Sequence, residues 1–274
     1  SRNDSFIYFD VYDRRIEGES DMIYFDNAAT TCVFPEVVEA MQDAMQVTYG
    51  NPSAKHMKGI EAENKVKAAQ ELIAKTLRAK PKEILFTSGG TESNNTAIIG
   101  TAMANRRKGK HIITTKVEHA SVYEPMYHLE EEGYEVTYLN VNENGIVDLE
   151  ELKAAIRPDT ILVSTMYVNN EVGAVVPVEE IGKLVHEKNS KTIYHVDAIQ
   201  AFGKLEIKPR RDNIDLLTVS GHKIHGPKGS GFIYIKKNTK INPIIFGGGQ
   251  QMGFRSGTEN VPGIAGIGQA SKDC

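Results

Sequence analysis

The chain has 274 residues, of which 40% are hydrophobic and 25% are charged, and its formal net charge is −4. This balance is typical of a globular α/β domain that buries a sizeable core, and it gives no basic footprint for nucleic acid. We see neither a signal peptide nor an apolar run of membrane-spanning length, so we expect neither a membrane protein nor a nucleic-acid-binding protein. The two cysteines, Cys32 and Cys274, cannot form a disulfide framework, which indicates a reducing compartment and a cytoplasmic location.

The two ends of the chain differ from the rest. Ser1 to Asp21 carries no apolar face that continues into the next segment, and Met22 is a natural start. We interpret these first residues as an N-terminal extension or an expression remnant, although Phe6 to Phe9 would suit an accessory strand. At the other end, Ala265 to Ala270 resembles the opening turns of a helix and the chain then stops, so we expect a C-terminal truncation.

Apolar strand-like runs alternate with helical patterns along the rest of the chain. Helical spacing is clear in Ile60 to Ala79 and in Val178 to Asn189. The strand-like runs are Ile84 to Thr87, His111 to Thr115, Glu135 to Leu139, Ile161 to Val168, Thr192 to Val196 and Leu216 to Val219. Such alternation predicts an α/β fold with a mostly parallel sheet covered on both faces, in which ligands bind at the carboxyl ends of the strands. Phe232 to Ile235 is expected to add an antiparallel strand.

A glycine-rich turn follows the first predicted strand. Ser88 to Asn95 opens an apolar-periodic helix, so the backbone amides around Gly90 and the hydroxyl of Thr91 are suited to cradle a phosphate. A plain glycine turn with a capping threonine explains the same pattern equally well. A second glycine pattern, Gly221 to Gly229, has Walker-like spacing but lacks the residues that a nucleotide-binding loop needs, so we discount a P-loop.

Polar residues also follow the later strands. His119 comes just after a strand end, where an imidazole can stack on a heterocycle or carry a proton near neutral pH. Asn170 follows the strongest strand run, where its amide can bind a cofactor oxygen. The alternatives are that His119 has only a structural role, as a lone histidine often does, and that Asn170 belongs to an asparagine turn. His222 and His225 are three residues apart, a spacing that also suits zinc, but a third local ligand is missing, so metal is a minor alternative.

Lys223 and Asp197 form the most informative pair. Lys223 lies just after the apolar run Ile214 to Val219, and Asp197 ends the strand before it. A lysine and an acid at the ends of neighbouring buried strands are what an enzyme needs to hold pyridoxal phosphate as a Schiff base while the ring nitrogen stays protonated. Gln200 lies three residues beyond Asp197, close enough to reach the phenolic oxygen of the same ring. The alternative for Asp197 is a helix N-cap.

The motifs occur in a specific order along the chain. The series is Asp26 to Thr31, Tyr49 to Ser53, Ser88 to Asn94, Glu118-His119, Asn169 to Gly173, His195 to Gln200, Ser220 to Lys223 and Arg255 to Thr258. From about Met22 to the end, this series closely resembles the cysteine desulfurases of iron-sulfur cluster assembly, in the class V aminotransferase group. The resemblance implies that residues 22–274 are the large domain of a pyridoxal phosphate transferase. That domain has a mostly parallel seven-stranded sheet with helices on both faces, and the small C-terminal domain is missing.

The resemblance also implies a role for each matching residue near the cofactor ring. Lys223 matches the lysine that forms the Schiff base, Asp197 the partner of the pyridine nitrogen, and Gln200 a donor to the phenolic oxygen. His119 matches the imidazole that stacks on the ring and carries a proton. Asn170 matches the asparagine that contacts substrate and cofactor.

The phosphate end of the cofactor is implied in the same way. Thr91, Ser220 and His222 match phosphate ligands of the family, and Gly90 belongs to the same loop. Thr258 matches a residue that reaches the phosphate of the neighbouring subunit, which implies a homodimer with shared active sites.

The implied activity converts L-cysteine to L-alanine and passes the sulfur, as an enzyme persulfide, to an iron-sulfur scaffold or another acceptor protein. The family's nucleophilic cysteine lies beyond the last residue, and neither Cys32 nor Cys274 matches it. We therefore expect this chain to bind cofactor but to be catalytically incomplete. The open alternatives are another class V aminotransferase, a selenocysteine lyase, or a non-catalytic cofactor-binding dimer module.

Overall fold

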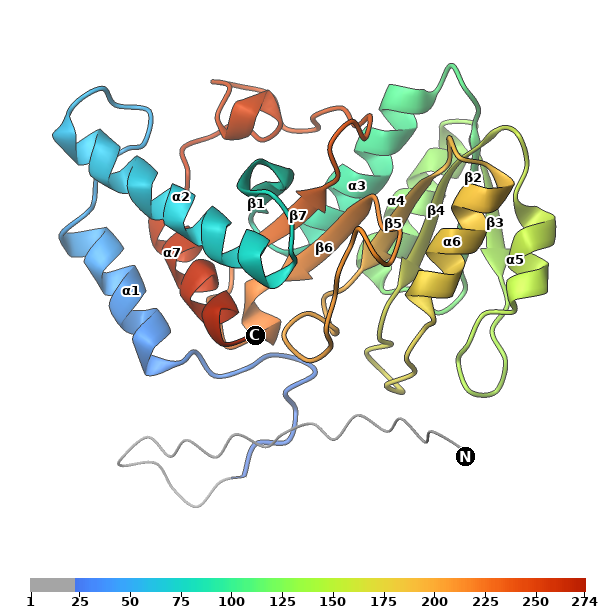
Figure 1. The fold of residues 1–274 in the computed structure, drawn as a ribbon, viewed down its shortest axis with the longest axis horizontal. Coiled ribbons are helices and arrows are strands. Elements are labelled where there is room, and N and C mark those ends of the chain that lie inside the picture. Colours follow the sequence, from blue (N-terminus) through green and yellow to red (C-terminus); the bar gives the residue numbers. More distant parts are fainter. Residues whose placement is uncertain (1–22) are drawn as a thin grey trace.

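Seven strands form one mixed sheet in the computed structural model, which describes residues 23–274 (Figure 1). The strands are β1 (Ile84–Thr87), β2 (His111–Thr115), β3 (Glu135–Leu139), β4 (Thr160–Met166), β5 (Ile193–Asp197), β6 (Leu216–Ser220) and β7 (Gly231–Ile235). Their order in the sheet is β1-β7-β6-β5-β4-β2-β3; β7 is antiparallel to both neighbours and the other neighbouring pairs are parallel. The predicted sheet and its antiparallel strand are therefore confirmed. The predicted extension, Ser1 to Asp21 with its candidate strand Phe6 to Phe9, lies outside the described residues.

Helices cover both faces of this sheet (Figure 1). They are α1 (Pro35–Gln46), α2 (Met57–Thr76), α3 (Gly90–Asn105), α4 (Ala120–Glu131), α5 (Leu149–Ala155), α6 (Val178–Lys188) and α7 (Val261–Ala270). One core cluster joins the sheet to α2, α5, α6 and α7, and a second joins the opposite face to α3 and α4. In the part of the chain described, no helix is both long and apolar enough to cross a bilayer.

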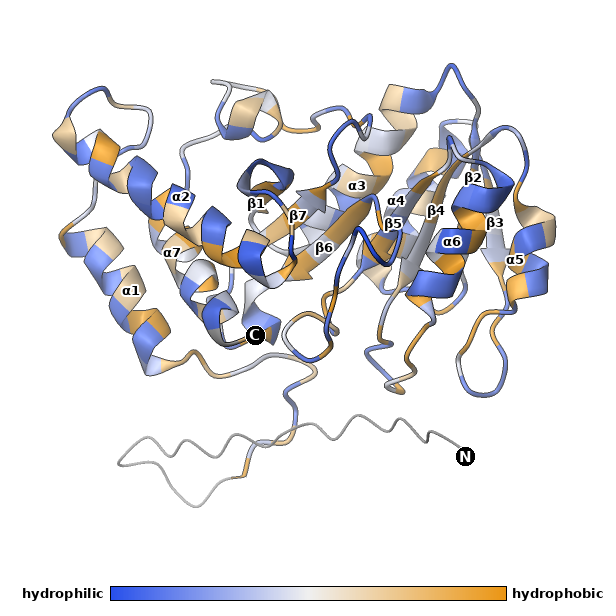
Figure 2. Cartoon of the chain, in the orientation of Figure 1, coloured by the Kyte–Doolittle hydropathy of each residue, from blue (hydrophilic) through white to orange (hydrophobic). Residues whose placement is uncertain are grey.

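Apart from the edge strand β3, which is partly exposed, the strands are largely apolar on both faces because both faces are buried. In β1, Ile84 and Phe86 join the first cluster while Leu85, between them, joins the second. Figure 2 shows the central strands as mainly hydrophobic and α6 as alternating between hydrophobic and hydrophilic residues. This pattern explains why near-continuous apolar runs identified the strands in the sequence.

Parallel strands bring the predicted site motifs to one edge of the sheet. β2, β4, β5 and β6 run in the same direction, so their carboxyl ends meet at that edge. His119, Asn170, Asp197 and Lys223 each lie at or just after one of these ends.

The end of β4 differs from the predicted one. The strand was expected to run to Val168, but it ends at Met166, and Val168 pairs with Val175 in an isolated antiparallel bridge. The chain therefore turns back on itself just beyond the strand, and this turn carries Asn170.

Candidate active site

A cavity of about 480 Å³ opens at the carboxyl ends of β4, β5 and β6. Most of the residues expected to bind the cofactor line it: Gly90, Thr91, His119, Asn170, Asp197, Gln200, Ser220, His222 and Lys223. The lining also includes Asp26, Ala28 and Ala29, from the segment that precedes α1. Thr258 does not line the cavity; it is exposed on the segment between the short 3-10 helix Gln251–Gly253 and α7.

Lys223 ends a short 3-10 helix, Gly221–Lys223, directly after β6. Its Nζ donates hydrogen bonds to the carbonyl oxygens of Ala28 and Ala29, the latter at 2.8 Å. Burial lowers the pKa of Lys223, while the charges of Asp26 and Asp197 oppose that shift. A lowered pKa leaves more of the amine neutral and therefore nucleophilic.

Asp197 is the last residue of β5 and is 5% exposed. Its Oδ1 accepts from the backbone N–H of Ile199 at 3.0 Å, and its Oδ2 accepts from Nδ2 of Asn94 at 2.8 Å. Burial raises the pKa of Asp197, and these hydrogen bonds and the nearby His119 and Lys223 act against the rise. One oxygen thus accepts from the turn after β5, where no helix begins, and the carboxylate also lines the cavity.

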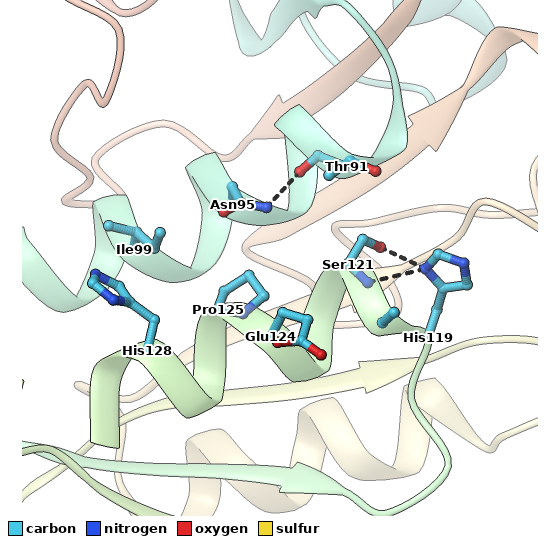
Figure 3. A pocket seen from close by; sticks show the side chains of 9 residues that line it. Thr91, Asn95, Ile99, His119, Ser121, Glu124, Pro125 and His128 are labelled. Atoms are coloured by element: carbon cyan, nitrogen blue, oxygen red, sulfur yellow. Dashed lines mark hydrogen bonds between the residues drawn. The ribbon is translucent and has the colours of Figure 1, made fainter. Parts of the chain in front are cut away.

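His119 is the N-cap of α4 and is exposed to the cavity. Its Nδ1 accepts from the backbone N–H of Ser121 at 3.1 Å and lies 2.8 Å from the Ser121 hydroxyl (Figure 3). A groove of about 390 Å³ continues from His119 between α3 and α4 and is lined further along by Glu124 and His128 (Figure 3). His119 therefore has a structural role and also lies between the cavity and this groove.

Two amides line other parts of the cavity. Gln200 donates from Nε2 to the carbonyl oxygen of Ala28 at 2.9 Å. Asn169 makes the asparagine turn, since its Oδ1 accepts from two following backbone N–H groups at 2.9 Å. This leaves Asn170 at the cavity, where it donates to the Glu171 carboxylate at 2.7 Å.

The expected phosphate end lies where α3 begins. Gly90 starts this helix, and the preceding Gly89 has φ of 148°, a conformation that favours glycine. Ser220 and His222 line the cavity from the end of β6, and Nδ1 of His222 lies 3.2 Å from the Thr30 hydroxyl. These groups fit an anion, because N–H groups in the first turn of a helix point outward with partial positive charge.

The two histidines of the zinc alternative have different surroundings. His222 lines the cavity, whereas His225 stacks on Phe34 with ring centroids 4.0 Å apart and contacts the carbonyl oxygen of Cys32. Within residues 23–274, no group of three His, Cys, Asp or Glu side chains is placed to hold a metal ion.

Sequence reasoning missed several residues that shape this site. Asp26 and Ser121 line the cavity, and Asn94 contacts Asp197 from behind it. Glu118, next to His119, spans the ends of two strands: its Oε1 accepts from the Thr115 hydroxyl at 2.6 Å and from the backbone N–H of Met166 at 3.0 Å. All four residues lie in or beside the motif series, but only the folded arrangement shows their contacts.

Comparisons with known proteins show what the chain is similar to. A family model described as aminotransferase class-V matches residues 23–272. The cysteine desulfurase IscS of Dictyoglomus turgidum is 50% identical over 248 residues, covering 90% of this chain and 62% of that protein. The cysteine desulfurase IscS of Methanosarcina thermophila is 48% identical over 257 residues, covering 94% and 63%. The chain thus spans less than two thirds of the length of these curated relatives.

Two solved structures are similar to this chain in both sequence and fold. A NifS-like protein superposes with a TM-score of 0.89 at 45% identity, covering 91% of this chain and 68% of that chain. A structure described as SspA in complex with cysteine gives a TM-score of 0.87 at 43% identity, covering 90% and 72%.

Proposed function

The chain belongs to the class-V aminotransferase family, and from that premise we propose that it is the cofactor-binding part of a pyridoxal phosphate-dependent cysteine desulfurase. The placement of Lys223 and Asp197 on one cavity carries the proposal. Residues 22–274 would be the large domain of such an enzyme. The names of the relatives, which are 48% and 50% identical, support the desulfurase activity over the other activities of the family.

The chemistry of the lining fits pyridoxal phosphate. The amine of Lys223 would bind the aldehyde carbon, the buried Asp197 carboxylate would face the ring nitrogen, and Gln200 would donate to the phenolic oxygen. The phosphate would lie at the start of α3, against Gly90, Thr91, Ser220 and His222. When bound, this cofactor supplies an electron sink that weakens the bonds to the α carbon of an amino acid.

The protein's own groups would direct that chemistry. Asp197 would place its carboxylate against the ring nitrogen and so favour the protonated, electron-withdrawing form of the ring. The Lys223 amine would move a proton at its Nζ, because its lowered pKa makes the neutral form accessible. His119 is a second proton carrier on the same cavity, and Asn170 would orient the substrate.

We further propose L-cysteine as the substrate and an iron-sulfur scaffold or another acceptor protein as the destination of its sulfur. The structural neighbour described as a complex with cysteine supports the substrate. A cytoplasmic homodimer belongs to the same proposal, with the exposed Thr258 of each subunit reaching the phosphate in the other. Another class V aminotransferase, a selenocysteine lyase and a cofactor-binding dimer module remain the competing functions.

Cofactor titration followed by addition of amino acids tests the proposal. The wild-type chain and the control Lys228→Ala, which alters an exposed lysine, should gain an absorption band near the visible edge with pyridoxal phosphate, and Lys223→Ala should not. The band should then change with L-cysteine and not with L-aspartate. A colourless wild type would contradict the cofactor site, and a response to L-aspartate alone would favour an aminotransferase.

A further inference from the structure

Asn94 is fully buried in α3, directly behind the candidate active site. Its Nδ2 donates to Oδ2 of Asp197 at 2.8 Å and to the hydroxyl of Ser121 at 2.9 Å, and its Oδ1 accepts from the hydroxyl of Thr218 at 2.5 Å. The amide therefore has partners on both of its atoms, which makes any rearrangement costly in a buried site.

The orientation of this amide is fixed by chemistry. An amide nitrogen only donates and an amide oxygen only accepts. If the Asn94 amide were flipped, its oxygen would face the carboxylate of Asp197, and both atoms would be acceptors. The carboxylate thus fixes the direction of every hydrogen bond that Asn94 makes.

On the sheet side, the donor-to-acceptor order that Asp197 sets continues through side chains of β6, β5 and β4. Thr218 in β6 donates its hydroxyl proton to Asn94, so it accepts from Nε2 of His195 in β5 at 3.3 Å. Burial lowers the pKa of His195 to about 3, so the ring is neutral and carries one proton. With that proton on Nε2, Nδ1 accepts from the hydroxyl of Ser164 in β4 at 2.8 Å.

On the cavity side, the same donor-to-acceptor order extends through Ser121 to His119. The Ser121 hydroxyl accepts from Asn94, so its own proton is free to go to Nδ1 of His119, 2.8 Å away. The backbone N–H of Ser121 donates to the same Nδ1 at 3.1 Å (Figure 3). Because Nδ1 accepts both hydrogen bonds, the neutral ring carries its proton on Nε2.

We propose that Asn94 is a positioning residue that joins Asp197 and His119 in one directional hydrogen-bond chain and holds the proton of His119 on Nε2. The role of this hydrogen-bond chain rests on the proposed function, in which Asp197 and His119 contact the same cofactor. Nε2 becomes the ring nitrogen that exchanges a proton with substrate or cofactor, while Nδ1 stays bound to Ser121.

Nitrogen-15 NMR of the histidine rings tests this assignment in the cofactor-free protein. At about pH 9, well above the usual histidine pKa of about 6.5, each ring nitrogen shows whether it carries a proton. His119→Gln identifies the resonances of His119. We expect a pyridine-type Nδ1 and a pyrrole-type Nε2 in the wild type.

Two substitutions should change this signature. Asn94→Leu keeps the branched shape of the side chain but removes its hydrogen bonds, and Ser121→Ala removes the hydroxyl and leaves the backbone N–H. We expect the Nδ1 resonance to move towards the mean of the two types in Ser121→Ala, which removes the hydroxyl donor, and less far in Asn94→Leu, which leaves that hydroxyl in place but no longer fixes its direction. Asn95→Ala is the matched control, because Asn95 donates only to the carbonyl oxygen of Thr91 within the helix, and it should leave the resonances unchanged.

The outcomes separate this inference from the proposed function. A protonated Nδ1 in the wild type would overturn it, as would His119 resonances that do not change in Asn94→Leu. If Asn94→Leu does not fold by circular dichroism, Asn94→Ala, which removes the same amide without adding apolar bulk, decides instead. These spectra need no cofactor. A wild type that shows the expected tautomer but fails to bind pyridoxal phosphate would therefore contradict the proposed function and leave this inference intact.

Discussion

Glu118 offers a prediction that can be worked through from the structure. Its Oε1 has two donors, but Oε2 is covered and has no hydrogen-bond partner in the described part of the chain. Burial raises the pKa of Glu118 from 4.5 to about 8, and the neighbouring charge of Asp197 adds to the rise. The side chain is therefore protonated and neutral at pH 7 in the folded protein. The change we consider is Glu118→Gln, which keeps the shape and the accepting oxygen.

The size of the effect follows from proton linkage. Between pH 4.5 and about 8, the folded state holds a proton on Glu118 that the unfolded state has lost, so the free energy of unfolding falls as pH rises. Each pH unit is worth about 1.4 kcal/mol. The cost is below about 1 kcal/mol at pH 5 and reaches about 3 kcal/mol at pH 7. Glutamine does not titrate, so the variant avoids this cost.

Urea unfolding at pH 5, 6, 7 and 8 measures the difference between Glu118→Gln and the wild type. We expect the variant's advantage to grow by about 2 to 3 kcal/mol between pH 5 and pH 7. Glu131→Gln removes a charge from an exposed position at the end of α4 and controls for the change in net charge. A difference that stays constant with pH would refute the argument, because it would mean that Glu118 is ionised in the folded protein.

Two further predictions, one on glycine packing and one on a histidine ion pair, test other parts of the account. Gly231→Ala should lower stability by about 1–3 kcal/mol and weaken pyridoxal phosphate binding at least about tenfold, because the added Cβ would lie 2.7 Å from the backbone of Gly89. Gly90→Ala, whose Cβ meets the movable end of a side chain, should cost less in urea unfolding; equal losses would count against the steric reason. The hydrogen bond to Asp215 raises the pKa of His186, so this pair stabilises the fold below about pH 6.5 and loses its effect as pH rises. His186→Gln should therefore cost about 2 kcal/mol in urea melts at pH 5.5 and little at pH 8.5, and a cost that is the same at both would contradict the assignment.

The fold was predictable because most of its strands are buried on both faces. Runs such as Ile112-Ile113 and Leu216-Leu217 must be apolar on both sides of the sheet, so the strands show clearly in the sequence. Their parallel direction then brought Asp197 and Lys223 to one edge. The end of β4 at Met166 was not predicted, since the bridge between Val168 and Val175 depends on a local reversal that apolar runs do not encode, although an asparagine turn is one alternative that the sequence offers there.

The site was predictable where a residue follows a strand and less so where it lies within a helix. Asn94 belongs to the motif after β1, but its contact with Asp197 depends on how α3 packs across the sheet. The protonation of Glu118 depends on burial, which the sequence does not show. The role of Thr258 stays a prediction, because it concerns a second copy of the chain.

Borohydride reduction followed by peptide mass spectrometry tests the central claim most directly. The chain is incubated with pyridoxal phosphate, reduced and digested, and the lysine that carries the cofactor is identified. The account predicts the label on Lys223 and its loss in Lys223→Ala. Label on another lysine of the same region, such as the half-buried Lys204, or no label at all, would contradict it.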